Sequence, residues 1–248
     1  MNSKIEVYRL EESDFIEWDE FVDRSYNGTM FHTRKFLSYH PQDRFRDHSL
    51  YFQKKDKRLA IFSAASVNEK HGNILHSHPG ATIGGFLTET SSSLKESFDL
   101  VASLVKYARD EKFSGIKITL PPNYYSEPTS NYMEFALLKI GFTYLKREVS
   151  SMMLLSGTIE ETMKGFKSSH RQAVRKAEKE GVQIRQSKIF ETFYGILKNN
   201  LSKRHGVSPT HSLKELELLQ AIFPKKVLLH GAFLKDCLLY TSDDADDT

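Results

Sequence analysis

The sequence predicts an α/β (α+β) protein: a mixed, mostly antiparallel sheet flanked by helices, in tandem with a second, truncated unit of the same kind. Three observations support this. Apolar and polar residues alternate in several short segments before residue 80, amphipathic helical patterns follow, and the order of elements begins again near Thr158.

The first half of the chain is predicted to form a meander and then alternating helices and strands. Alternation and turn residues indicate strands over 4–10, 47–53, 59–67, 73–78, 116–120 and 142–155. Apolar stripes indicate helices over 14–25, 34–39, 92–112 and 129–140. The short helix should stop before Pro41, because proline disfavours the α conformation in the residue that precedes it.

The second half repeats the pattern from Thr158. It predicts a helix, a basic helix from Ser168, a strand over 182–186, helices over 190–204 and 213–223, and a strand over 226–234. We therefore expect a first domain over residues 1–155 and the N-terminal part of a second domain over residues 156–236.

The basic helix is the most informative segment. Arg171, Arg175 and Lys179 recur at i, i+4 and i+8, so they share one face that could hold an anion. Small apolar residues opposite them should pack on a sheet: Ala173, Val174 and Ala177. Ser168 or Ser169 is the expected N-cap and Gly181 the expected stop. The alternative is a merely solvated charged face.

Residues 237–248, CLLYTSDDADDT, differ from the rest, with four aspartates in the last six positions. They resemble the translation of a sequencing adapter, and we interpret them as an artefact that interrupts a protein continuing beyond Asp236. Without those four charges the formal net charge rises from +3 to +7.

Composition indicates a soluble, cytoplasmic protein. The chain has no apolar window of membrane-spanning length, and its N-terminus is acidic where a signal peptide needs an apolar core. Cys237 is the sole cysteine, so no internal disulfide is expected, and no Cys/His spacing suits zinc.

Four segments carry a resemblance to a known family: Asn27-Gly28-Thr29 before Phe31-His32-Thr33, SHPGATIGG at 77–85, RQAVRKAEKEGVQI at 171–184, and KRHGV at 203–207. Together with the element order, they resemble the FemAB/FemX-like branch of the GNAT acyltransferase superfamily, whose members have two GNAT-like domains. The resemblance implies an enzyme that transfers an acyl or aminoacyl group to an amine, often on a peptidoglycan or surface-sugar precursor.

The resemblance also implies partners. The donor would be acyl-CoA or aminoacyl-tRNA, the acceptor a small molecule or a nucleotide-sugar-linked amine, and no prosthetic group or DNA would be bound. A peripheral membrane contact stays open. The Gly-x-Gly pyrophosphate loop of simple GNAT enzymes is absent from the sequence, so we expect the chain as given to be inactive.

The glycine-rich run is the candidate ligand-facing turn of the first domain. Glycines let a backbone approach a ligand, and free N–H groups at Gly80, Gly84 and Gly85 could hold a phosphate or carboxylate. A bulge that shapes the sheet is the alternative. His76 and His78 share one side of a strand, but without a third ligand we expect substrate contact or packing rather than a metal.

Further candidates flank two helices. His32 and His40 lie beside the short helix where the resembled family contacts its acceptor, and either imidazole could act as a base. Arg204 and His205 resemble a family site for acceptor phosphates, although cations also suit a helix C-terminus. No catalytic residue is assigned. The predicted substrate-binding residues are His32, His40, His76, His78, Gly80, Gly84, Gly85, Arg171, Arg175, Arg204 and His205.

Two other functions remain compatible with the sequence. A pI of about 8.7 and the basic helix also suit a tRNA-binding module, although Glu178 and Glu180 interrupt the basic run. The missing donor loop suits a non-catalytic scaffold with a GNAT-like fold.

Overall fold

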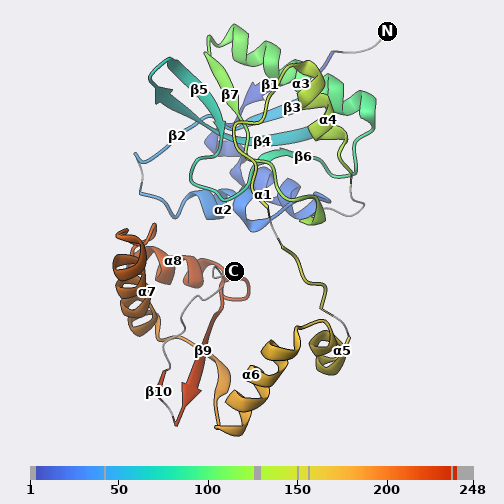
Figure 1. Cartoon of the computed structure of the whole chain (residues 1–248). Helices are drawn as coiled ribbons and strands as arrows, with labels where there is room; N and C mark the ends of the chain where they lie inside the picture. The colour runs from blue at the N-terminus through green and yellow to red at the C-terminus, as the bar shows by residue number, and fades with distance from the viewer. Residues whose placement is uncertain are drawn as a thin grey trace. The chain divides into compact units, whose positions relative to one another are not determined.

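The computed structural model describes residues 4–41, 43–125, 130–149, 151–155, 157–235 and 237–238. The chain divides into two compact units, Met1–Leu145 and Lys146–Thr248. Figure 1 shows a mixed sheet with helices in the first unit and a smaller sheet with helices in the second.

The sheet of the first unit has the order β1-β3-β4-β5-β7, with β2 and β6 also paired to β4. Only β5 and β7 are parallel; the other pairs are antiparallel. The strands are β1 (Glu6–Arg9), β2 (Arg46–Asp47), β3 (Leu50–Lys54), β4 (Lys57–Glu69), β5 (Gly72–Ser77), β6 (Gly85–Leu87) and β7 (Gly115–Lys117). The predicted mixed, mostly antiparallel sheet is thus confirmed.

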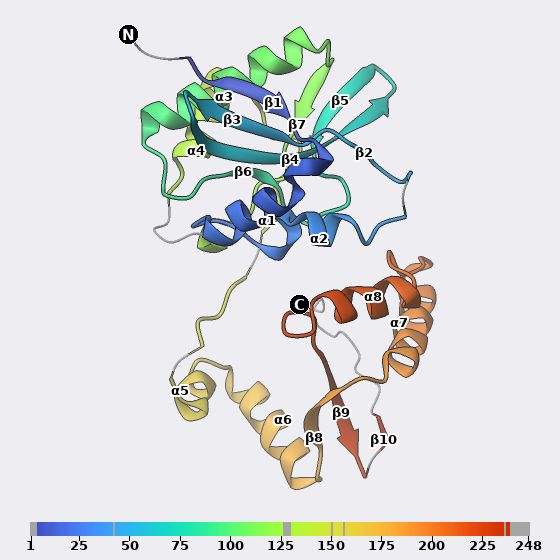
Figure 2. The ribbon, with the colours of Figure 1, turned by 180° about the vertical axis from the view of Figure 1, so that it is seen from behind.

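Among the described residues of this unit, four α-helices and three short 3-10 helices accompany the sheet. They are η1 (Glu12–Asp14), α1 (Phe15–Arg24), η2 (Met30–His32), α2 (Arg34–Leu37), α3 (Leu94–Asp110), η3 (Asn123–Tyr125) and α4 (Tyr132–Ile140). In Figures 1 and 2, α3 and α4 lie on one side of the sheet, and α1 and α2 lie at the other.

The core of the first unit lies between the sheet and α3. Leu50, Phe52 and Phe62 of the sheet meet Leu100 and Leu104 of the helix, and all five are buried. The helix starts at a capping box, in which Ser93 and Glu96 satisfy each other's backbone N–H groups. The helix predicted over 92–112 is confirmed as α3, although Leu94 at its start is 40% exposed.

The second unit has a three-stranded antiparallel sheet of order β10-β9-β8. Its elements are α5 (Ile159–Lys164), α6 (Ser168–Lys179), β8 (Gln183–Ser187), α7 (Phe190–His205), α8 (Leu213–Ile222), β9 (Leu229–Leu234) and β10 (Cys237–Leu238). Among its described residues, the buried large apolar side chains are Phe190, Leu219 and Phe233. This core is much smaller than that of the first unit.

Three local predictions fail. The strand expected over 142–155 does not form, since residues 142–149 and 151–155 have no regular structure. The N-cap of α6 is Lys167, without a side-chain bond, rather than Ser168 or Ser169. No residue of α6 is buried, so Ala173, Val174 and Ala177 do not pack on a sheet here. A strand and an apolar helix face both need partners from other parts of the chain, which local periodicity cannot guarantee.

The stop at Gly181 is confirmed, because Gly181 has φ of +87° and its N–H reaches the Glu178 carbonyl at 3.0 Å. At the C-terminus, Cys237 and Leu238 pair with β9, and the rest of the proposed artefact lies outside the described residues. In the part of the chain that is described, no helix is long and apolar enough to cross a membrane.

Candidate functional site

The first unit brings His40, His78 and Gly80 together at the end of β5. His40 Nε2 donates a hydrogen bond to the Gly80 carbonyl at 2.8 Å. The His40 and His78 rings are stacked with centroids 6.4 Å apart, and Phe45 contacts both rings edge-on. These four residues form what we call the histidine cluster. Residues 40 positions apart in sequence therefore lie side by side.

The backbone N–H groups of the glycine-rich loop donate hydrogen bonds to other groups of the first unit. Gly80 N donates to His78 Nδ1 at 3.2 Å, Ala81 N to the His78 carbonyl at 3.0 Å, and Gly84 N to the Thr119 carbonyl at 2.8 Å. These groups are not free to cradle an anion, contrary to one of the two interpretations of the sequence. Gly85, with φ of +102°, pairs with Ser63 at the start of β6. The loop thus shapes the sheet.

Close packing explains why glycine occurs at two of these positions. A Cβ at Gly80 would lie 2.3 Å from His40 Nε2 and 2.5 Å from the Phe45 ring. A Cβ at Gly84 would lie 2.9 Å from Ser77 Oγ. Such distances are far inside van der Waals contact, so both glycines are required by the packing of the loop.

His32 lies inside the fold rather than at its surface. Its side chain is 1% exposed, its Nδ1 shares a hydrogen bond of 2.9 Å with Thr29 Oγ1, and its carbonyl accepts a bond from the Trp18 indole at 2.8 Å. These contacts attach the segment after α1 to the body of the unit. They favour a structural role for His32 over contact with a ligand.

Burial keeps two of the imidazoles neutral. It lowers the pKa of His32 to about 4, against the opposing effects of backbone hydrogen bonds at Gly84 and Thr29. Burial also lowers the pKa of His78 to about 4, although the Asp47 carboxylate acts in the other direction. A general base works best with a pKa near the working pH. Both rings are therefore too weakly basic to take a proton from an ammonium group at neutral pH.

His76 stands on β5 beside Lys117 of β7, its partner in the parallel pairing. It is half-buried, and burial followed by the Lys117 charge lowers its pKa. Among the described residues, no group of three or more His, Cys, Asp or Glu side chains could hold a metal ion. His76 therefore offers a polar contact beside the histidine cluster.

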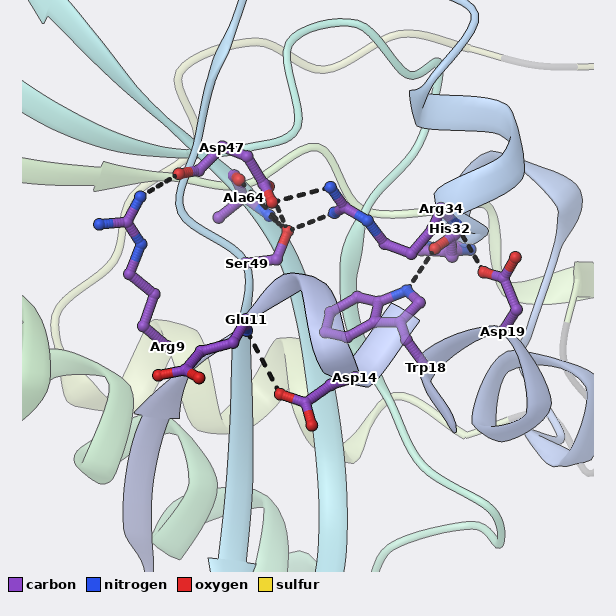
Figure 3. A network of polar contacts seen from close by, with 10 residues as sticks. All are labelled: Arg9, Glu11, Asp14, Trp18, Asp19, His32, Arg34, Asp47, Ser49 and Ala64. Atoms are coloured by element: carbon purple, nitrogen blue, oxygen red, sulfur yellow. Dashed lines mark hydrogen bonds and ion pairs between the residues drawn. The ribbon is translucent and has the colours of Figure 1, made fainter. Parts of the chain in front are cut away.

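An ion pair that the sequence did not suggest supports this end of the sheet (Figure 3). Arg34 Nη2 lies 2.8 Å from Asp47 Oδ2, and Arg34 Nη1 donates to Ser49 Oγ at 3.1 Å. Ser49 Oγ in turn donates to Asp47 Oδ1 at 2.6 Å. The Arg34 guanidinium also lies over the Phe15 ring at 4.6 Å. No spacing motif links Arg34 with Asp47, because they lie thirteen positions apart in the sequence.

The cations of the second unit occupy two separate places. Arg171 and Arg175 are on α6, whereas Arg204 and His205 are exposed in the last turn of α7 before Gly206. Figure 1 shows these two helices well apart within the unit. The Arg171 guanidinium donates to the Phe166 carbonyl, which leaves Arg175 as the more available charge of the pair on α6.

A groove of about 460 Å³ lies elsewhere on the first unit. It is lined by α3 and the end of α4: Ala102, Val105, Lys106, Arg109, Asp110 and Ile140. None of the predicted site residues lines it, so we do not connect it with the histidine cluster.

Comparison with solved structures shows a shared fold. The chain is similar to the crystal structure of FemX, with a TM-score of 0.60 and 17% identity; the match covers 92% of this chain and 57% of the FemX chain. A GNAT family acetyltransferase from Staphylococcus aureus matches with a TM-score of 0.37 and 12% identity, over 60% of this chain and 98% of that one.

An aminoglycoside N-acetyltransferase in complex with CoA matches with a TM-score of 0.38 and 9% identity, over 61% of this chain and 96% of that one. No protein-family model matches the chain, and no curated protein matches it by sequence. The chain therefore has the fold of FemX, in line with the resemblance carried by its motifs, and it spans little more than half the length of that protein.

Proposed function

We propose that this chain is part of an acyltransferase of the FemX type, which transfers an acyl or aminoacyl group to an amine on a cell-envelope precursor. The observation that carries the proposal is the likeness to FemX over 92% of the chain. The four sequence segments that resemble the FemAB/FemX-like branch also support it.

The chemistry that this fold would perform needs no nucleophilic side chain of its own. Attack of a neutral amine on an acyl carbonyl requires mainly that both groups be held close and correctly oriented, which can lower the barrier by about 7 to 11 kcal/mol. The histidine cluster supplies the neutral His78 imidazole, the His40 imidazole and the Phe45 ring at the end of β5, which suit positioning through hydrogen bonds and packing. We assign it to acceptor binding.

The second unit carries cations that suit a phosphate-bearing acceptor. We propose that Arg204 and His205 contact its phosphates, since guanidinium and phosphate form charge-assisted, bidentate hydrogen bonds. The proposed donor is either acyl-CoA or aminoacyl-tRNA.

Transfer assays test the proposal. A longer form of the chain, since the chain as given is expected to be inactive, is incubated with labelled acyl-CoA or aminoacyl-tRNA and a nucleotide-sugar-linked amine, and label on the acceptor is measured. For Arg204→Ala we expect the acceptor KM to rise about tenfold, the loss of one charge-assisted hydrogen bond, with Lys198→Ala on the same helix as the control.

The outcomes separate the alternatives. An unchanged KM for Arg204→Ala would remove Arg204 from the site. If neither donor supports transfer by this chain or by a longer form of it, the non-catalytic scaffold is the better description.

A further inference from the structure

Four side chains from four strands lie in one row across the sheet of the first unit. Asp47 of β2 is opposite Ala65 of β4, and Ala65 is also opposite His76 of β5. His76 in turn is opposite Lys117 of β7, the strand that lies beside β5 in Figures 1 and 2. Residues opposite one another on neighbouring strands point to the same face of a sheet. The row therefore places a carboxylate, an imidazole and an ammonium group on one face.

This face is the one that points away from α3. The residues that precede members of the row, Ala64, Leu75 and Ile116, all pack in the core beneath α3. Because successive side chains of a strand point to opposite faces, His76 and Lys117 point the other way. The histidine cluster follows two positions further along the chain from His76. The row thus extends the polar surface at this end of the sheet.

The two charged ends of the row differ in their partners. Asp47 Oδ2 lies 2.8 Å from Arg34 Nη2. Within the part of the chain that the structure describes, no ion pair joins Lys117 to a carboxylate. The Glu69 carboxylate is on the exposed end of the β4–β5 hairpin, four positions and about 13 Å along β4 from the row. Among the described residues, the Lys117 ammonium group thus lacks a nearby counter-charge.

The Lys117 end of the row is accessible to a ligand. Lys117 and His76 are half-buried, and Thr119, two positions after Lys117, is exposed. The His76 ring makes no hydrogen bond to any of the described residues. Burial, followed by the Lys117 charge, lowers the pKa of His76, so its ring is neutral at neutral pH and can donate one hydrogen bond. A ligand here would meet one positive charge beside one neutral donor.

We propose that Lys117 and His76 bind a carboxylate group of a ligand. One ammonium group and one uncharged N–H donor match an anion that has a single negative charge and two acceptor oxygens. A phosphate monoester carries nearly two negative charges at neutral pH, so a single lysine would leave one of them without a partner. The charges in the row therefore favour a carboxylate.

The inference deepens the proposed function by naming a chemical group on the acceptor. It rests on that function only for the identity of the ligand, because the carboxylate would belong to an amine acceptor of the amino-acid or peptide class. Binding of a carboxylate requires no acyl transfer, so the two proposals can fail separately.

NMR titration of the full chain tests the inference. The probes are N-acetylglycine, the uncharged N-acetylglycinamide and inorganic phosphate. We expect N-acetylglycine to shift the backbone signals of His76 and Lys117 saturably, and N-acetylglycinamide to leave them in place. Lys117→Met should weaken the binding of N-acetylglycine about tenfold, the loss of one charge-assisted hydrogen bond. His76→Phe, which removes only a neutral donor, should weaken it about fivefold.

Lys70→Met is the matched control, because Lys70 is exposed in the turn between β4 and β5 and its loss removes the same charge from the same sheet. This variant should bind N-acetylglycine like wild type. His76→Phe keeps every lysine, so it tests the site even where Lys117→Met does not fold.

Three results would overturn the inference. They are the absence of a saturable shift with N-acetylglycine, equal binding of N-acetylglycinamide, and a loss in Lys70→Met as large as that in Lys117→Met. Tighter binding of phosphate than of N-acetylglycine would overturn it as well, because the site would then select phosphate. Saturable carboxylate binding without acyl transfer would count against the proposed function alone.

Discussion

At the scale of single residues, the site depends on buried groups that stay uncharged. His32 and His78 are almost fully buried, and burial holds the pKa of each near 4. Sequence position had suggested that an imidazole near the first turn could be a base. The structure instead makes His32 a connector, because its ring bonds to Thr29 and its carbonyl accepts a bond from Trp18 of α1.

The buried His32 predicts a loss of stability in acid. Its ring binds a proton at pH about 6.5 in the unfolded chain but only near 4 when folded, so the unfolded state holds more protons between these values. Stability should therefore be complete above pH 6.5 and fall as the pH drops toward 4, by up to about 3 kcal/mol from His32.

Urea unfolding at neutral pH and at about pH 5 measures this effect. The difference between the two pH values should be smaller in His32→Gln, because glutamine does not titrate, and unchanged in the exposed His71→Gln. Equal differences in all three proteins would contradict the assignment.

At the scale of elements, the glycine-rich loop between β5 and β6 determines whether the histidine cluster forms. Gly80 leaves space for the His40 and Phe45 rings, and Gly84 for Ser77. This close packing arises between segments far apart in sequence. For that reason a ligand-binding turn and a shape-determining turn could not be distinguished from the sequence.

Substitution of glycine by alanine should have opposite effects on stability at two positions, one in each unit. Gly80→Ala should reduce the free energy of unfolding by about 1 to 3 kcal/mol, because its Cβ would overlap two rings. Gly195→Ala should increase it by up to about 1 kcal/mol, because Gly195 lies inside α7 and its Cβ would meet nothing within 4 Å.

Thermal unfolding of wild type and of the two variants measures both changes in stability. A Gly80→Ala protein as stable as wild type would show that the loop can relax away from the histidine cluster.

At the scale of the whole molecule, the two units differ sharply in their cores. The first unit buries a continuous set of apolar residues between its sheet and α3, whereas the described part of the second buries three large ones. Stability follows buried apolar area, so the second unit should open first.

Limited proteolysis tests this difference. Trypsin should cut early at Lys146 or Arg147, which are exposed and lie in a segment without regular structure. A resistant fragment ending near residue 146 should then persist, and mass spectrometry identifies it. Early loss of fragments from the first unit would show that its core is not the more stable one.

The likeness to FemX is also a property of the whole chain. It extends over nearly the whole chain, while the two motif-derived sites, the histidine cluster and the cations of α6 and α7, belong to different units. A variant in each unit therefore tests the two proposed sites separately.

Much of the fold follows from local sequence alone. The alternation in β1, β3, β4 and β5, the Ser93–Glu96 capping box and the glycines after α4, α6 and α7 are short-range features, and each element forms close to where it was predicted. Such features depend on residues within one turn or strand, so they can be recognised without knowledge of neighbours.

Other properties depended on tertiary contacts. The strand expected over 142–155 needs a partner edge, the small apolar face of α6 needs a surface to cover it, and the N–H groups of the glycine-rich loop take acceptors as distant as Thr119. The Arg34–Asp47 pair likewise joins an early helix to the sheet. A sequence shows which groups require a partner, but only the folded chain decides which of them find one, because those partners come from distant parts of it.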